Sequence, residues 1–426
     1  MESHFLELKR EIISTTDKVR LTASWTDLLQ EMAKVTDEIA RQGSDIIPQV
    51  NFSDLDNLSS EQIDDIRRKG SVVVRGVVNT DEAVKWKTDL HEFINNNPHA
   101  PGFPRHDKQF FHLYWTPSQV QARAHPNVLK VNSWLNNLYR FKSDERAEGV
   151  DLSCPLVYAD RFRIRHPGVQ WHNHPPHTDG GSIERWEDVN FRKCFADILS
   201  GNWRQHDPYH LEHRLDARSD LYDRPDQASV FRTFQGWLAL SETAPTEGTL
   251  RVFPDVAISN AYIILRPFFR PRPTVRLDAL TVFDPKNWEL DTSTPDFPGI
   301  ERCGTGFIGP QPTPVLHPHL RLKETMTSMP KVYPGDMVFW HCDVVHSVEQ
   351  DHTGKNDSVV MYIPAVPKTP QNWSYILKQA DAFRMGANPP DFGQAEGGVT
   401  YVGLAVESDI KGPIGRMAMG LPIEAT

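Results

Sequence analysis

Two histidines and an aspartate could together bind one metal ion, although they lie far apart in the chain. His177 and Asp179 are separated by one residue, and His346 follows much later. On a strand, residues at this spacing point to one face, because side chains alternate with a period of two. A histidine from a second strand would complete two imidazoles and one carboxylate, leaving other coordination positions open. This facial triad is typical of non-heme Fe(II) oxygenases, which bind a cosubstrate and O2 at the open positions.

Other histidines compete for the same role. His341 and Asp343 repeat the His-x-Asp spacing close to His346, and the chain has 18 histidines in all. His172 and His174 precede His177 and invite a zinc interpretation. Two prolines stand between His174 and His177, so the cluster cannot lie on a helix. We therefore expect His172 and His174 on a solvated loop at the mouth of the site.

The overall composition is that of an ordinary folded domain and excludes several classes of function. Charged residues make up 24% and hydrophobic residues 39% of 426 residues, as in soluble globular proteins. The net charge of -10, without a basic run, argues against a nucleic-acid partner. Four scattered cysteines fit a reducing compartment rather than a disulfide scaffold. The first residues carry charge, and no apolar stretch approaches a membrane span. We expect a cytoplasmic protein with no membrane partner.

Helical patterns come first in the chain and strand patterns follow. Residues 1–60 are predicted to form a helical segment that packs on the core, because apolar residues recur at three- and four-residue spacing. A short strand is expected at 70–78, followed by helices at about 81–93 and 117–141. From about residue 155, strands alternate with Pro and Gly turns, notably at 161–165, 230–240, 248–254, 337–341 and 359–363. A helix at about 369–385 precedes the tail.

This order favours a mainly β fold with flanking helices, built on a double-stranded β-helix (a jelly-roll or cupin-like core). The predicted domain covers residues 61–385, with insertions at about 182–228 and 266–330, and a tail at 386–426. In such a core, strands distant in sequence are neighbours. The long gap between Asp179 and His346 is therefore compatible with a shared metal.

An ordered set of motifs resembles phytanoyl-CoA-hydroxylase-type 2-oxoglutarate dioxygenases. The set comprises Pro167-Gly168, the His177-Thr-Asp179 motif, residues 235–254, and the turn Pro334-Gly-Asp336 that leads to His346. Within that group, residues 159–165, 177–186 and 358–364 are similar to the DUF1479 family. The resemblance covers roughly residues 60–380. It implies a double-stranded β-helix that holds Fe(II) through His177, Asp179 and His346. His346, rather than His341, lies at the expected distance from the Gly-Asp turn.

The resemblance also implies a cosubstrate site and shows one departure from the pattern. Phytanoyl-type enzymes place an arginine about ten residues after the distal histidine, but here Ser358 stands near that position. Another arginine should then bind the far carboxylate of 2-oxoglutarate, because guanidinium groups match carboxylates in bidentate fashion. Arg165, Arg163 and Arg251 are the candidates. Trp237 matches a tryptophan beside the cosubstrate in the same enzymes.

The predicted function is therefore oxidation of a small molecule. Fe(II), 2-oxoglutarate and O2 would be consumed in a hydroxylation or related reaction that releases succinate and CO2. Trp186, Arg185 and Tyr114 are candidates for the substrate pocket, and the arginines would suit an anionic substrate. The missing arginine leaves two alternatives open: a cupin-type metal enzyme without a keto acid, and a non-catalytic binding protein on the same scaffold.

Overall fold

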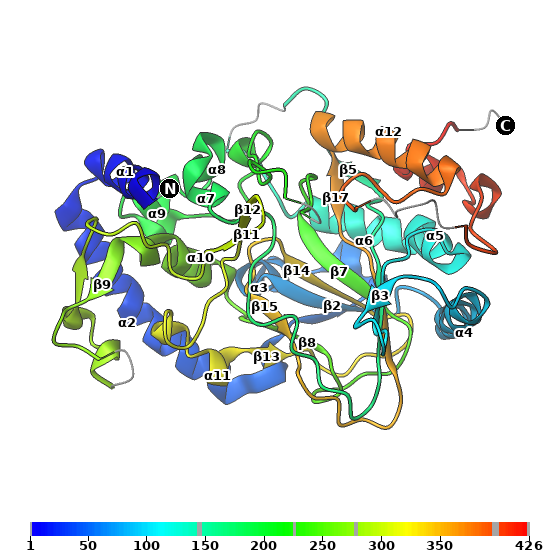
Figure 1. Ribbon diagram of the computed structural model, residues 1–426, viewed down its shortest axis with the longest axis horizontal. Helices are drawn as coiled ribbons and strands as arrows, with labels where there is room; N and C mark the ends of the chain where they lie inside the picture. Colours follow the sequence, from blue (N-terminus) through cyan, green and yellow to red (C-terminus); the bar gives the residue numbers. More distant parts are fainter. Residues whose placement is uncertain (1, 143–146, 225–226, 277–279, 394–399, 424–426) are drawn as a thin grey trace.

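A computed structural model describes residues 2–142, 147–224, 227–276, 280–393 and 400–423. It contains a large mixed β-sheet covered by helices (Figure 1). The longer helices are α1 (Glu2–Ser14), α2 (Lys18–Gln42), α3 (Ser60–Lys69), α4 (Thr80–Asn96), α5 (Pro117–Ala124), α6 (Pro126–Asn136), α10 (Val256–Leu265) and α12 (Pro370–Met385). Shorter helices are α7 (Glu184–Glu187), α8 (Val189–Lys193), α9 (Ala196–Leu199), α11 (Leu322–Thr325) and α13 (Pro413–Ala418). Within the described ranges, no helix is both long and apolar enough to span a bilayer.

The largest sheet has eight strands. Their spatial order is β1 (Gln49–Asn51), β2 (Ser71–Arg75), β14 (Met337–His341), β7 (Phe234–Ala239), β16 (Ser358–Tyr362), β6 (Phe162–Arg165), β4 (Phe110–Phe111) and β3 (Gly102–Phe103). β1 pairs with β2 in parallel, and the other pairs in this sheet are antiparallel. The central strands are buried along their whole length, so they lack the alternation of a half-exposed strand.

A second sheet has three strands in the order β13 (Thr327–Ser328), β8 (Leu250–Val252) and β15 (His346–Val348). An isolated antiparallel bridge between His177 and His346 adds one more position to its edge. The remaining strands form pairs: β9 (Phe269–Pro271) with β10 (Trp288–Leu290), β11 (Glu301–Cys303) with β12 (Gly306–Ile308), and β5 (Asp151–Leu156) with β17 (Val366–Lys368).

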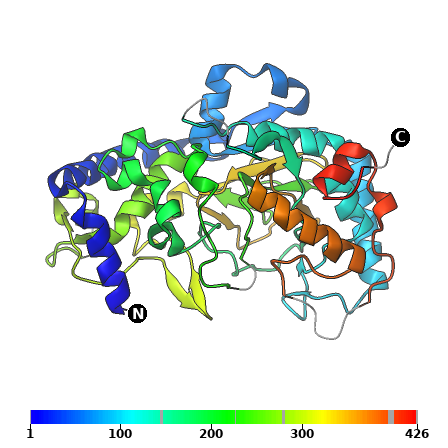
Figure 2. The same cartoon turned by 90° about the horizontal axis from the view of Figure 1, so that it is seen from above.

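Helices α1 and α2 lie at one end of the molecule and α12 lies toward the other, with the sheets between them (Figures 1 and 2). Trp25 of α2 stacks on Phe269 at a ring-centroid distance of 4.5 Å and on Tyr262 of α10 at 5.5 Å. Aromatic stacking of this kind adds to the burial of large apolar area. Helix α2 is thus joined to the main apolar core.

Several predicted elements appear with different bounds. The helix expected at 117–141 is two helices, because His125 precedes Pro126 and adopts an extended conformation that a helix cannot continue through. The insertion expected at about 266–330 includes the strands β9 to β12. Helix α3 begins at Ser60. Ser59 forms a capping box with Gln62, which satisfies two free N–H groups at the N-terminus of α3.

Candidate metal centre and its cavity

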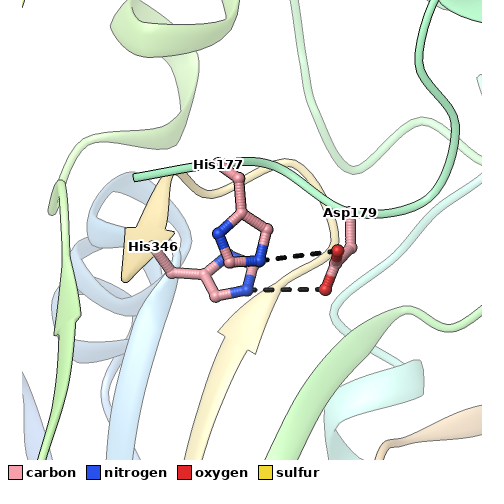
Figure 3. A group of neighbouring side chains, drawn as sticks. All are labelled: His177, Asp179 and His346. Atoms are coloured by element: carbon pink, nitrogen blue, oxygen red, sulfur yellow. Dashed lines mark ion pairs between the residues drawn. The ribbon is translucent and has the colours of Figure 1, made fainter. Parts of the chain in front are cut away.

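His177, Asp179 and His346 converge on one point, as Figure 3 shows. His177 and His346 exchange two backbone hydrogen bonds of 2.9 Å across their bridge, which places their imidazoles side by side with ring centroids 4.2 Å apart. The Nε2 atoms lie 3.6 Å (His177) and 3.4 Å (His346) from the two carboxylate oxygens of Asp179. One ligand atom from each residue lies within 4.8 Å of the others. This separation suits three ligands of a single ion.

The local backbone at this site differs from the predicted strand. His177 takes part only in the isolated bridge, and Asp179 lies beyond it in irregular structure. Gly180 and Gly181 follow with φ of 76° and 99°. A side chain at Gly181 would also meet the ring of Phe191 at 2.8 Å. The bend that presents Asp179 therefore needs glycine at that position.

Hydrogen bonds fix the tautomer of both histidines. Nδ1 of His177 donates to the carbonyl of Pro175 at 2.7 Å, and Nδ1 of His346 donates to the carbonyl of Val344 at 3.0 Å. A carbonyl can only accept, so each Nδ1 carries the hydrogen and each Nε2 keeps its lone pair. This arrangement is the one that orients a histidine for metal binding.

Electrostatics favour a neutral His177 and an ionised Asp179. Burial lowers the pKa of His177, and the neighbouring His346 lowers it further. Burial alone would raise the pKa of Asp179, but His177 and His346 outweigh it and hold that pKa well below its ordinary value. Neutral imidazoles beside an ionised carboxylate are the ligating forms of these groups.

A cavity of about 250 Å³ opens at the three residues. Of the residues predicted for the cosubstrate, Arg163 and Trp237 line it. Other lining side chains were not predicted, among them Tyr158, Arg224, Gln227, Arg232, Gln235, Gln311, Trp340 and Tyr362. The cavity is thus rich in arginine and amide groups around one candidate metal position.

Arg163 is the most buried cation on the cavity wall, with 1% of its surface exposed. It lies on β6, and its Nη2 donates to the carbonyl of Gly248 at 3.2 Å. Its Nε has no partner, and no described carboxylate approaches its guanidinium within 4.0 Å. Burying a cation without a carboxylate partner is costly, so this guanidinium is suited to bind an anion.

A protein-family model described as Gig2-like matches residues 1–421 of the chain. The chain belongs to the Gig2-like family. An Escherichia coli K12 protein, the uncharacterized protein YbiU, is 31% identical over 95% of both chains. The crystal structure of GIG2 (DUF1479) from Candida albicans superposes with a TM-score of 0.87 and 32% identity, covering 99% of this chain and 90% of the other. A hypothetical protein from Escherichia coli, JW0805, gives a TM-score of 0.82 at 28% identity, covering 98% and 97%.

In this Gig2-like chain, two arginines predicted for the cosubstrate are not among the described cavity-lining residues. Arg165 donates to the carbonyls of Glu349, Gln350 and Val169 at 2.9 to 3.1 Å. Burial and the nearby Arg163 lower the pKa of Arg165 to about 10. Arg251 donates to the carbonyl of Met326. Both guanidiniums therefore serve mainly to satisfy backbone carbonyls.

The three residues predicted for the substrate pocket of this Gig2-like chain also lie elsewhere. Trp186 is buried and donates through Nε1 to the carbonyl of Ile264. Tyr114 packs against Phe392 in a separate apolar cluster. Arg185 is buried outside the cavity lining, where it donates to the carbonyls of Gly181 and Asp179 and to the carboxylate of Asp343. The residue type alone, aromatic or arginine, does not show whether a side chain packs in the core or lines the cavity.

Neither His172 nor His174 joins the three candidate ligands. His172 is exposed, as expected of a loop at the site mouth. His174 differs from the expectation, since it is partly buried and lines the cavity. Its Nδ1 accepts a hydrogen bond from Trp171 at 2.8 Å, and burial lowers its pKa to about 3. His174 is therefore a neutral group on the cavity wall.

His341, the competing histidine, has no free ring nitrogen. Its Nδ1 accepts from the backbone N–H of Asp343 at 3.1 Å, so its Nε2 carries the hydrogen and donates to the hydroxyl of Tyr139 at 2.6 Å. Burial lowers the pKa of His341 to about 3. His341, Cys342 and Asp343 form a second cluster of possible ligands. Since their polar atoms are engaged within the protein, the geometry favours His346 as the distal ligand.

A buried ion pair holds the backbone of the candidate ligand Asp179. Arg185 donates to the carbonyl of Asp179 at 2.8 Å and to the carboxylate of Asp343 at 2.7 Å. Arg214 binds the other oxygen of Asp343, which is 1% exposed. Burial would raise the pKa of Asp343, but Arg214 and Arg185 hold it well below its ordinary value. Asp343 thus fixes Arg185, and Arg185 fixes the residue that would bind the metal.

We expect Asp343→Asn to weaken binding of a divalent metal ion at this candidate site about 10- to 100-fold, the usual effect of losing a group that orients a ligand. The variant leaves two buried guanidiniums without their carboxylate, so it should also lose about 3 to 5 kcal/mol of stability. Anaerobic calorimetry at a temperature where the variant is folded measures the affinity. Asp64→Asn is the matched control, because Asp64 has 75% of its side chain exposed. Unchanged metal affinity in folded Asp343→Asn would show that Asp343 does not position Asp179 through Arg185.

Proposed function

We propose that the chain is a non-heme Fe(II)- and 2-oxoglutarate-dependent dioxygenase that oxidises a small molecule. One observation carries the proposal. Two neutral imidazoles and an ionised carboxylate meet at the wall of a cavity that also holds Arg163, a buried cation without a carboxylate partner. The donor set is the facial triad of Fe(II) oxygenases, and the cation suits the far end of a dicarboxylate.

The strand order supports a jelly-roll core beneath this site. From β6 onwards the chain passes repeatedly between the two main sheets. β6, β7, β14 and β16 belong to the large sheet, while the His177 bridge, β8, β13 and β15 belong to the small one. Such alternation between two sheets is how a jelly roll brings distant strands together. It explains why His177 and His346 are adjacent.

The residues at the site would have separate roles. His177, Asp179 and His346 would hold Fe(II) from one side and leave its other positions open. When bound, Fe(II) with 2-oxoglutarate and O2 supplies the oxidising power, and 2-oxoglutarate leaves as succinate and CO2. Arg163 would bind and orient the far carboxylate of 2-oxoglutarate, and Trp237 would exclude water beside it.

The proposal is tested by anaerobic titration of the Fe(II)-loaded protein with 2-oxoglutarate. We expect a visible charge-transfer band, because a keto acid chelated to Fe(II) absorbs there and unbound keto acid does not. Saturation should occur at one 2-oxoglutarate for each bound iron. Iron binding without the band would reject the keto-acid chemistry. It would leave the cupin-type enzyme or the non-catalytic binder as the function of the site.

A further inference from the structure

Two arginines on the cavity wall remain after the metal and the cosubstrate are assigned. Arg224 belongs to the segment that follows His177, and it packs near Gly306 of β12. Arg232 lies two residues before the start of β7, and its guanidinium lies 5.7 Å from the ring of Tyr158. No described carboxylate forms an ion pair with either guanidinium, and Nε of Arg224 is buried without any partner.

Charges of both signs around the cavity leave an excess of cations. Arg161 is neutralised by Asp160, with Nε 2.9 Å from the carboxylate. Asp391 acts electrostatically with Arg232, but its oxygens accept from Ser229 and Tyr158. In the proposed complex, the two charges of Fe(II) are balanced by Asp179 and the keto-acid carboxylate of 2-oxoglutarate. Arg163 balances the other carboxylate of the cosubstrate, so Arg224 has no counterion and Arg232 has only the more distant Asp391, with which it forms no ion pair.

Buried donors on the same wall point to the same kind of ligand. Of the 17 buried polar side-chain atoms without a partner in the described residues, six belong to residues that line this cavity. They are Nε of Arg163, Nε of Arg224, Nε2 of Gln235, Nε1 of Trp340, and the hydroxyls of Thr178 and Ser182. The four nitrogens can only donate. Their partners must therefore be acceptors, which oxyanions supply in greatest number.

We infer that the primary substrate is a small acid whose carboxylate or phosphate group is bound by Arg224 and Arg232. This inference rests on the proposed function, because it assigns Arg163 to the cosubstrate. The acid group would fix the substrate so that a carbon elsewhere in the same molecule faces the metal. A neutral molecule of the same shape would leave two cations desolvated, which makes the acid group the main determinant of specificity.

The test is a binding screen on the Fe(II)-loaded protein with 2-oxoglutarate present. The probes are aliphatic and aromatic carboxylic acids, each paired with its own primary amide, and phosphate monoesters, each paired with its parent alcohol. The readouts are the position of the charge-transfer band and the thermal midpoint. We expect acids to bind and their neutral partners not to bind. The two sets of pairs distinguish carboxylate from phosphate recognition.

Variants locate the binding to the two arginines. Arg224→Gln and Arg232→Gln should each weaken the best acid about 10- to 150-fold, since hydrogen bonds to charged groups have that strength. Both should keep the 2-oxoglutarate band. Arg204→Gln is the matched control, because Arg204 forms an exposed ion pair with Asp27. Equal binding of acids and neutral partners, absence of any binding acid, or unchanged affinity in both variants would overturn the inference.

Failure of the substrate inference can be separated from failure of the proposed function. If 2-oxoglutarate gives no charge-transfer band, the proposed function fails, but the thermal midpoint with Fe(II) alone still reports acid binding. If the band forms in the wild type while no acid binds, the dioxygenase proposal stands and the anionic substrate is rejected.

Discussion

Replacing His346 with alanine is expected to abolish 2-oxoglutarate turnover and the charge-transfer band. The substitution removes one of the three proposed metal ligands, and the Nε2 of His346 lies only 3.4 Å from the carboxylate of Asp179. Losing a group that merely orients a ligand costs about 10- to 100-fold in metal affinity. Loss of the ligand itself should exceed that range. Iron content after desalting, and succinate formed from 2-oxoglutarate, measure the two effects.

His341 and His172 provide the controls for this experiment. His172→Ala alters an exposed histidine near His177 and should leave both iron content and turnover unchanged. His341→Gln removes a buried ring that hydrogen-bonds Tyr139, so it should lower the thermal midpoint. At a temperature where it is folded, it should still bind iron. Iron retained by His346→Ala but lost from folded His341→Gln would show that the distal ligand had been assigned to the wrong histidine.

The meeting of the candidate ligands was predictable, although the reason first given for it was only half right. The chain alternates between two sheets, and strands expected at 161–165, 337–341 and 359–363 are present as β6, β14 and β16. Within that frame, His346 can pair with His177 despite their distance in sequence. Asp179, however, lies beyond the bridge in a glycine-dependent bend. The side chains of His177 and Asp179 therefore meet because of this bend, and not because side chains alternate along a strand.

The cavity wall was much harder to predict. Arg163 and Arg165 occupy the same face of β6 by alternation, but only Arg163 lines the cavity. Alternation assigns a face and not a position along the strand, so it could not choose between them. Trp340 was missed because all five residues of β14 are buried and give no inward or outward pattern. Arg224 and Arg232 lie outside regular strands, where no periodicity marks a lining position.

The bounds of the helices, in contrast to the cavity wall, could be predicted from residues near each helix end. The break between α5 and α6 follows from Pro126, which restricts His125 to an extended conformation. The cap of α3 likewise follows from the Ser59 and Gln62 spacing. Local rules of this kind depend on one or two residues. The cavity depends on several segments that meet only in the folded chain.

Replacing Arg163 with glutamine is expected to weaken 2-oxoglutarate binding by a large factor while leaving iron binding intact. Truncating one partner of a buried charge pair costs about 2 to 5 kcal/mol, or roughly 30- to 4,000-fold at 1.4 kcal/mol per tenfold. Glutamine keeps the polar character and much of the length of the side chain but removes the charge. Anaerobic titration, followed by the charge-transfer band, measures the affinity.

A keto acid without the far carboxylate makes this test specific for the proposed contact. 2-Oxopentanoate has the same carbon chain as 2-oxoglutarate and can chelate iron through the same keto-acid end. In the wild type, 2-oxoglutarate should bind far more tightly than 2-oxopentanoate, because only the former can pair with Arg163. In Arg163→Gln the two affinities should become similar, since neither ligand then meets a buried cation.

Arg251→Gln and Arg165→Gln are the matched controls, because both arginines donate to backbone carbonyls and neither is among the cavity-lining residues. Arg251→Gln should preserve the preference for 2-oxoglutarate. Arg165→Gln should lower stability, because the carbonyls of Glu349 and Gln350 lose a donor. If Arg163→Gln kept the preference and Arg165→Gln abolished it, the far carboxylate would belong to Arg165. Arg165, the next residue on the same face of β6, would then replace the arginine that phytanoyl-type enzymes place after the distal histidine.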